Sequence, residues 1–174
     1  EAAAVLAANG IKVHIYTELM PTPMLSWAVR ACGCQAGIMI TASHNPAKYN
    51  GYKVYGEDGC QITLDVANTF ISKINAVEMF GGAKVMDYDE GVKSGMISYI
   101  GQDIIEKYFE KVLEQGIHTD LVADSGLKVV YTPLNGTGNK PVREILKRIG
   151  IKEVTVVPEQ ELPDGNFPTC PFPN

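Results

Sequence analysis

Apolar residues along the chain change between the two-residue period of strands and the 3.6-residue period of helices. Alternation from Ile11 to Tyr16 and an apolar run from Ala36 to Ile40 predict two strands. The residues between them predict a helix from about Met24 to Ala31. We expect Thr22 to cap this helix, with the prolines on either side of it fixing the helix entry.

The next stretch has the pattern of a hairpin followed by two helices. Tyr52–Tyr55 is expected to form a short strand, Glu57–Gly59 a turn, and Cys60–Ile62 the return of the hairpin. Apolar residues at helical spacing follow in Leu64–Val77 and again in Ile104–Leu113.

A second unit of the same kind begins after these helices. Leu127–Tyr131 predicts a strand, Lys140–Ile149 an amphipathic helix and Val154–Val157 another strand. Strands that alternate with helices are typical of layered α/β domains. We therefore predict a layered α/β domain with a mixed sheet at residues 1–112, and the incomplete start of a second, similar α/β domain at residues 113–174.

Composition narrows the class of protein. The chain has 174 residues, is 45% hydrophobic and carries a net charge of -5, which argues against nucleic-acid binding. No apolar run approaches the roughly 20 residues that span a bilayer, and the first residues lack a basic signal-peptide region. The four cysteines are expected to be free thiols. We predict a cytoplasmic protein without a membrane or nucleic-acid partner.

The ends of the sequence suggest a piece of something longer. Residues 1–10 have the pattern of the last turns of a helix that Gly10 closes, and the chain does not begin with Met. Residues 162–174 are rich in Pro and Phe and end without a predicted element. We expect the chain to be an N-terminal fragment.

The strongest chemical signal is the segment Thr41–Pro46, followed by Asn50–Lys53. Ser43 comes directly after a predicted buried strand, and ligands of open α/β sheets bind where strands end. A serine nucleophile needs exposure and a nearby base or metal, and Lys53 adds a cation on the next strand. A serine beside a histidine is usually a surface turn, so only the joint pattern indicates a phosphate-handling site.

This joint pattern resembles the active-site loop of the α-D-phosphohexomutase superfamily, that is, the phosphoglucomutase/phosphomannomutase family. The resemblance extends over nearly the whole chain, through Pro21–Ser26, Tyr49–Tyr55, Tyr131–Gly138 and Asp164–Pro168. It implies a domain similar to the first domain of these enzymes, truncated at its N-terminus, followed by part of the second.

The resemblance also implies a reaction and its residues. Ser43 would be the phosphoserine that exchanges a phosphoryl group with a phosphosugar, converting hexose 1-phosphate and hexose 6-phosphate through a sugar bisphosphate. His44 would help to position the sugar, Lys53 would act in general acid/base proton transfer, and Asn45 would support the loop. Mg²⁺ would bind Ser43 through its phosphate, with the remaining ligands beyond Asn174, and glucose 1,6-bisphosphate would be the activator.

The same sequence pattern is compatible with other activities. The parent protein could be a phosphopentomutase or a glucose-1,6-bisphosphate synthase of the same superfamily, or a non-catalytic module that binds sugar phosphates. The fragment alone is expected to be inactive, because the metal and sugar-reading segments of the family are not found in it.

Four further features have weaker chemical readings. The acidic cluster Asp87–Glu90 could bind a cation, but we interpret it as a solvated turn. Asn135–Gly138 could cradle a phosphate, but a tight structural turn is favoured. His14 and His118 are interpreted as structural residues.

Overall fold

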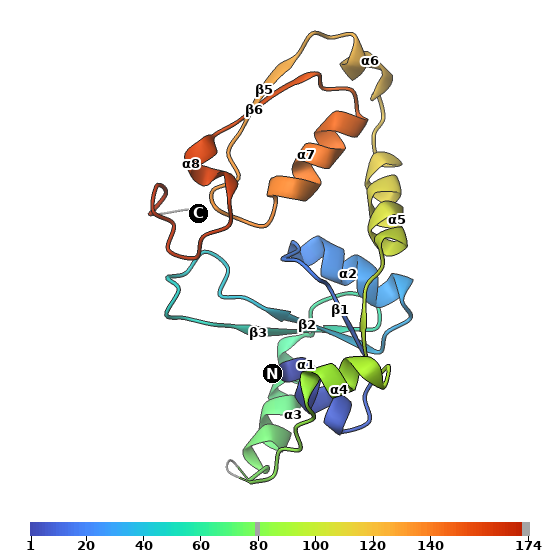
Figure 1. The fold of residues 1–174 in the computed structure, drawn as a ribbon, viewed down its shortest axis with the longest axis vertical. Coiled ribbons are helices and arrows are strands. Elements are labelled where there is room, and N and C mark those ends of the chain that lie inside the picture. Colours follow the sequence, from blue (N-terminus) through green and yellow to red (C-terminus); the bar gives the residue numbers. More distant parts are fainter. Residues whose placement is uncertain (79–80, 172–174) are drawn as a thin grey trace.

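The computed structural model describes residues 1–78 and 81–171, which form two bodies joined by a long helix (Figure 1). Its helices are α1 (Ala2–Ala8), α2 (Thr22–Ala31), α3 (Leu64–Asn75), α4 (Tyr88–Lys93), α5 (Gln102–Leu113), α6 (Asp120–Ala123), α7 (Asn139–Arg148) and α8 (Pro158–Glu161). Its strands are β1 (Val13–Ile15), β2 (Ala36–Ile40), β3 (Tyr52–Gly56), β4 (Ile97–Tyr99), β5 (Lys128–Tyr131) and β6 (Glu153–Val156).

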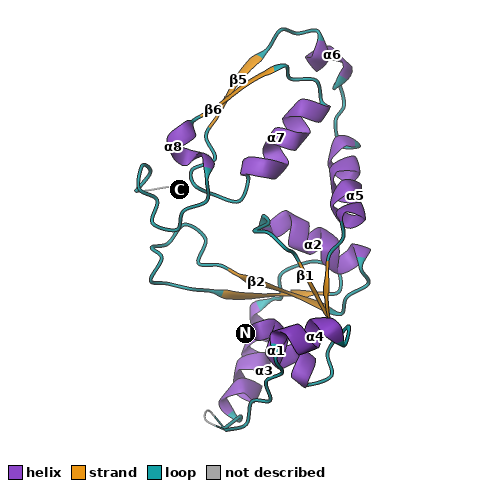
Figure 2. Ribbon diagram, in the orientation of Figure 1, coloured by secondary structure: helices purple, strands orange, loops and turns teal. Residues whose placement is uncertain are grey.

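The predicted α/β class is confirmed, but the strands of the described residues form three two-stranded sheets, parallel or antiparallel, in place of the single mixed sheet that was expected (strands orange in Figure 2). Strands β1 and β4 run parallel, β2 and β3 form an antiparallel hairpin, and β5 pairs in parallel with β6 after the α7 crossover. The β5–α7–β6 order is the second α/β unit that the sequence predicts. The predicted division after residue 112 falls in the last turn of α5 and stays a prediction. No helix in the described residues is long and apolar enough to cross a membrane.

Helix α2 carries the core of the first body. Met24 is fully buried, and Val29 is only 2% exposed. Strand β2 lies against this helix at Gly37, where an added Cβ atom would lie 2.5 Å from the Val29 Cγ2 atom. The glycine therefore lets β2 approach α2 closely. This close packing positions β2, the strand that precedes Ser43.

The start of α2 corrects one expectation. Pro21, in an extended conformation, is the N-cap residue, and Thr22 is already helical and makes no side-chain capping bond. The prediction that Thr22 caps the helix is wrong. The reason is that Pro21 occupies the non-helical position that a cap requires.

Two elements between α3 and α5 were absent from the expectations. Asp87 caps α4 by accepting a hydrogen bond from the Glu90 amide at 3.0 Å, so the acidic cluster begins a helix rather than forming a turn. Strand β4 follows it and contributes the buried Ile97 to the core. A six-residue helix and a three-residue strand are too short to show a clear period.

The β2–β3 hairpin is pinched where its loop begins. The Thr41 amide donates to the Gly51 carbonyl at 3.0 Å, which closes residues 42–50 into a loop. An added Cβ atom at Gly51 would lie 2.3 Å from the Thr41 carbonyl oxygen. Only glycine fits this approach without moving the backbone.

Truncation of Met24 should destabilise the first body. Because its side chain is fully buried, we expect Met24→Ala to lower the free energy of unfolding by about 2–5 kcal/mol, measured by urea denaturation. Leu19→Ala is the control, because Leu19 is 70% exposed and should change stability little. Equal losses in the two variants would contradict the assignment of the core.

Substitution of Gly51 should disturb the base of the loop. We expect Gly51→Ala to cost about 1–3 kcal/mol of stability, because the new methyl group collides with the Thr41 carbonyl. Gly82→Ala is the matched control, since the nearest atom to its new methyl group would be 3.5 Å away. Chemical unfolding of both variants checks this, and a Gly51→Ala protein as stable as the control would contradict it.

Candidate active site

Ser43 is the exposed third residue after β2, in a tight turn of the loop. Its amide donates to the Thr41 hydroxyl at 2.9 Å, and the Asn45 amide donates to the Ala42 carbonyl at 3.1 Å. Ser43 has φ +60°, a left-handed conformation that few residues other than glycine adopt. Backbone strain of this kind clusters at functional sites, where the surrounding structure maintains it.

His44 lies directly beside the Ser43 hydroxyl. The Nδ1 atom of its ring is 3.2 Å from Ser43 Oγ. When Nδ1 carries no proton, the serine hydroxyl donates to it, which is the arrangement of a nucleophile and a neighbouring base. His44 does not line the cavity described next, so its contact in this structure is with Ser43.

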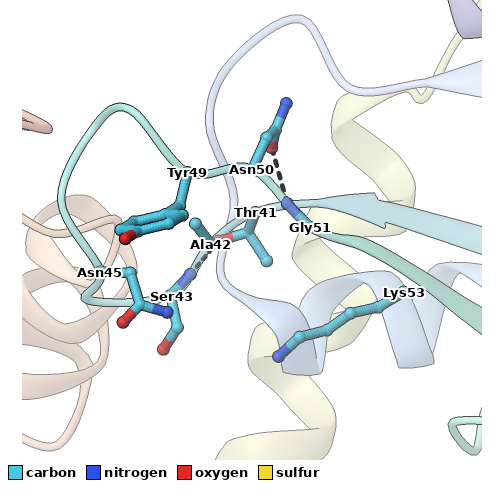
Figure 3. Close-up of a pocket in the computed structure, with 8 residues that line it drawn as sticks. All are labelled: Thr41, Ala42, Ser43, Asn45, Tyr49, Asn50, Gly51 and Lys53. Carbon is cyan, nitrogen blue, oxygen red and sulfur yellow. Dashed lines mark hydrogen bonds between the residues drawn. The ribbon is translucent and has the colours of Figure 1, made fainter.

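The loop and the start of β3 border an open cavity of about 440 Å³. Its lining consists of the loop residues and one strand lysine, namely Thr41, Ala42, Ser43, Asn45, Tyr49, Asn50, Gly51 and Lys53 (Figure 3). Ser43 and Lys53 thus share one cavity although they come from opposite ends of the loop. Lys53 reaches it because β3 folds back along β2, with Lys53 opposite Met39.

The charge of the cavity suits an anion. Among the described residues that line it, Lys53 carries the only formal charge, and no carboxylate takes part. The chain as a whole is acidic, so the cation is a local feature. A hydroxyl nucleophile and a half-buried ammonium group in one cavity are able to bind a phosphate and to exchange it.

Two lining residues lay in the segments that the sequence analysis singled out but had no role assigned to them. Thr41 supplies the hydroxyl that accepts from the Ser43 amide, a local turn for which a hydroxyl two residues earlier was the available signal. Tyr49 is 56% exposed, and its amide donates to the Pro46 carbonyl. Asn45 was expected to support the loop, and its main-chain amide does so by donating to the Ala42 carbonyl. Asn45 also lines the cavity.

Metal ligands are sparse around this cavity. In residues 1–78 and 81–171, no group of three or more His, Cys, Asp or Glu side chains is placed to hold a metal ion. The ligand expected from this chain is the phosphate on Ser43, and that role stays a prediction.

The weaker candidates take structural places. Asn135 is 7% exposed, and its side-chain amide donates to the Leu162 carbonyl at 3.0 Å, as expected of a structural turn. His14 contacts Ser98 Oγ at 2.9 Å across the β1–β4 pair. All four cysteines are free, and burial raises the pKa of Cys32 and Cys34, which makes them poor nucleophiles.

Comparison with known proteins assigns both bodies to domains of one enzyme family. The family described as phosphoglucomutase/phosphomannomutase, alpha/beta/alpha domain I, matches residues 1–80, and its domain II matches residues 106–174. The phosphoglucomutase of Staphylococcus saprophyticus is 37% identical over 174 residues, which are 100% of this chain and 31% of that protein.

Two further relatives differ in their stated activity. The glucose 1,6-bisphosphate synthase of Homo sapiens is 35% identical over 176 residues, covering 99% of this chain and 28% of that protein. A crystal structure of a putative phosphomannomutase from Thermus thermophilus superposes with a TM-score of 0.71 at 26% identity, covering 93% of this chain and 33% of that one. The chain therefore belongs to the phosphoglucomutase/phosphomannomutase family, of which it matches the first two domains.

Proposed function

We propose that the protein carrying this chain is a phosphosugar mutase that interconverts hexose 1-phosphate and hexose 6-phosphate, with Ser43 as the phosphoryl carrier. The observation that supports this most is the shared cavity of Ser43 and Lys53, on the loop of a chain that belongs to this family. The chain spans about a third of the relatives it matches, so the activity is proposed for the complete protein, in the cytoplasm.

The first transfer uses groups of this chain. The bond between phosphorus and Ser43 Oγ breaks while a bond forms to a hydroxyl oxygen of the sugar phosphate. The proton of that hydroxyl passes through Lys53 to the departing Ser43 oxygen, which restores the serine. His44, at 3.2 Å from Ser43 Oγ, positions that oxygen. The resulting sugar bisphosphate reorients in the site. Its other phosphate is then transferred to the Ser43 oxygen, which releases the isomeric sugar monophosphate.

Such a transfer depends mainly on position and charge. Phosphoryl transfer spreads negative charge over several oxygens, and proteins accelerate it by aligning the groups and offsetting that charge. Lys53 provides a positive charge within the cavity, and the turn around Ser43 holds the hydroxyl exposed. The cavity is open, so further segments would have to cover it to exclude water during the reaction.

Mg²⁺ and glucose 1,6-bisphosphate belong to the proposal as cofactor and activator. A phosphate on Ser43 would supply oxygen ligands of the kind that Mg²⁺ prefers. The described residues add no cluster of further ligands to it, so they fit only part of a magnesium site.

A glucose 1,6-bisphosphate synthase is the second candidate function. The Homo sapiens synthase is nearly as similar as the staphylococcal phosphoglucomutase, at 35% against 37% identity. Both activities would use the same serine, and they differ in the phosphoryl donor and acceptor. A panel of hexose and pentose phosphates, assayed with the complete protein in the presence and absence of a separate phosphoryl donor, separates them. A mutase isomerises the monophosphate without the donor, whereas a synthase accumulates the bisphosphate only with it.

Removal of the proposed carrier should abolish turnover. We expect Ser43→Ala in the complete protein to lower kcat for conversion of glucose 1-phosphate at least about 1,000-fold, because no group remains to carry the phosphoryl. The control is Ser72→Ala, which removes an exposed serine hydroxyl of α3. A Ser43→Ala enzyme with near-normal kcat would refute the proposal.

Loss of the lysine should slow the chemical step. We expect Lys53→Gln to reduce kcat by about 10²–10⁴-fold, the usual contribution of a positioned acid/base. The protein should remain folded by circular dichroism. Lys73→Gln, which alters an exposed lysine on α3, serves as the control in the same assay. Unchanged kcat in Lys53→Gln would show that the proton moves by another route.

A further inference from the structure

The turn Asp164–Phe167 of the second body lies next to the loop of residues 42–50 that carries Ser43, here called the Ser43 loop. An ideal Cβ atom built on Gly165 lies 3.7 Å from Ala47 Cβ, an ordinary van der Waals distance. Figure 1 shows the segment after α8, coloured red, beside the loop that joins β2 to β3. These two segments are far apart in the sequence, so their proximity is a product of the tertiary fold.

This turn has its own internal hydrogen bonds. The Asn166 amide donates to Asp164 Oδ1 at 2.8 Å, and the Phe167 amide donates to the Asp164 carbonyl at 3.2 Å. Phe167 has a positive φ of 47°. The conformation of the turn is therefore fixed by its own hydrogen bonds and not by the Ser43 loop. A turn of this kind is able to support the loop.

Asn135 anchors the turn to the second body. Its carbonyl accepts from the Asp164 amide at 3.1 Å, and its own amide donates to the Gln160 carbonyl at 2.9 Å. Its side-chain amide donates to the Leu162 carbonyl at 3.0 Å, and its side-chain oxygen accepts from Cys170 Sγ at 3.2 Å. With 7% exposure, these groups have no water to replace a lost partner, so their loss is costly.

Two ion pairs link α7 of the second body to segments before it in the chain. Lys140, in α7, pairs with Glu18 in the segment between β1 and α2. Arg148 at the end of α7 donates to Glu106 of α5 at 2.8 Å, and its guanidinium lies 4.7 Å from the centre of the Phe109 ring. These contacts contribute to the placement of the body that carries the turn.

The Ser43 loop needs such a support. Residues 43–50 are all exposed, and the strained backbone of Ser43 persists only where neighbouring structure enforces it. We propose that Asn135 is a positioning residue for the Ser43 loop, acting through the Asp164–Phe167 turn, which lies beside Ala47. The proposal rests on the proposed function, because the property that it sets is the rate at which Ser43 exchanges phosphate.

The contact itself is tested by a cross-link in the complete protein. Disulfides require Cβ atoms about 3.5–4.5 Å apart, and the Gly165 and Ala47 positions meet this requirement. We expect the double variant Ala47→Cys/Gly165→Cys to form a disulfide with oxidised glutathione, located by peptide mass mapping. Each single variant is a control for pairing with the native cysteines. Failure of the pair to form would overturn the proposal.

The positioning role is tested on the rate of Ser43 phosphorylation. Asn135→Gly tolerates the positive φ of this position but removes the side-chain bonds. We expect it to slow phosphorylation of Ser43 by glucose 1,6-bisphosphate with Mg²⁺ about tenfold to 100-fold in rapid-quench experiments, as for a displaced reacting group. The matched control is Asn166→Ala, because the turn bond of Asn166 comes from its main chain.

Rescue separates positioning from simple loss of stability. We expect the Ala47–Gly165 disulfide, introduced into the Asn135→Gly protein, to restore the rate to within about twofold of the wild type, and a reductant to reverse the rescue. A normal rate in Asn135→Gly, or no rescue by the disulfide, would overturn the positioning role while leaving the proposed function intact. A wild-type protein that is never labelled at Ser43 would overturn both.

Discussion

The closed hairpin between β2 and β3 is the constraint on which the candidate site depends. The hydrogen bond from the Thr41 amide to the Gly51 carbonyl pinches the loop, and the antiparallel pairing returns the chain along the strand it has just left. As a result, Ser43 and Lys53 border one cavity although they lie at opposite ends of the loop. Gly51 makes this possible, because any side chain there would meet the Thr41 carbonyl.

The β2–β3 hairpin packs on helix α2, and its loop lies beside the second body. Gly37 lets β2 lie close to the buried face of α2. Helix α2 in turn contacts α5, where the Trp27 indole donates to the Ile104 carbonyl at 3.0 Å. From α5, Arg148 continues the contacts to α7. The same helix thus connects the core beneath the site to the body that carries the Asp164–Phe167 turn, so both supports of the loop depend on its position.

The sequence predicted those features that arise from local patterns. Strands β2 and β3 and helices α2, α5 and α7 follow from apolar periodicity, and Ser43 and Lys53 follow from a motif on consecutive elements. Short elements such as β4 were missed because three residues show no period, and the role of Thr22 was misassigned because Pro21 took the cap position. The cavity position of Tyr49, the strained φ of Ser43 and the proximity of Gly165 to Ala47 depend on how the loop closes in space. Periodicity carries no information about these.

The central claim is that Ser43 itself carries the phosphoryl group. Mass spectrometry of peptides tests this most directly, on the complete protein after incubation with glucose 1,6-bisphosphate and Mg²⁺. The account predicts one added phosphoryl group on the peptide that contains Ser43, with fragment ions that place it on Ser43 rather than Thr41. A folded protein that starts unphosphorylated and gains no phosphate there, or gains it on another residue, would contradict the account.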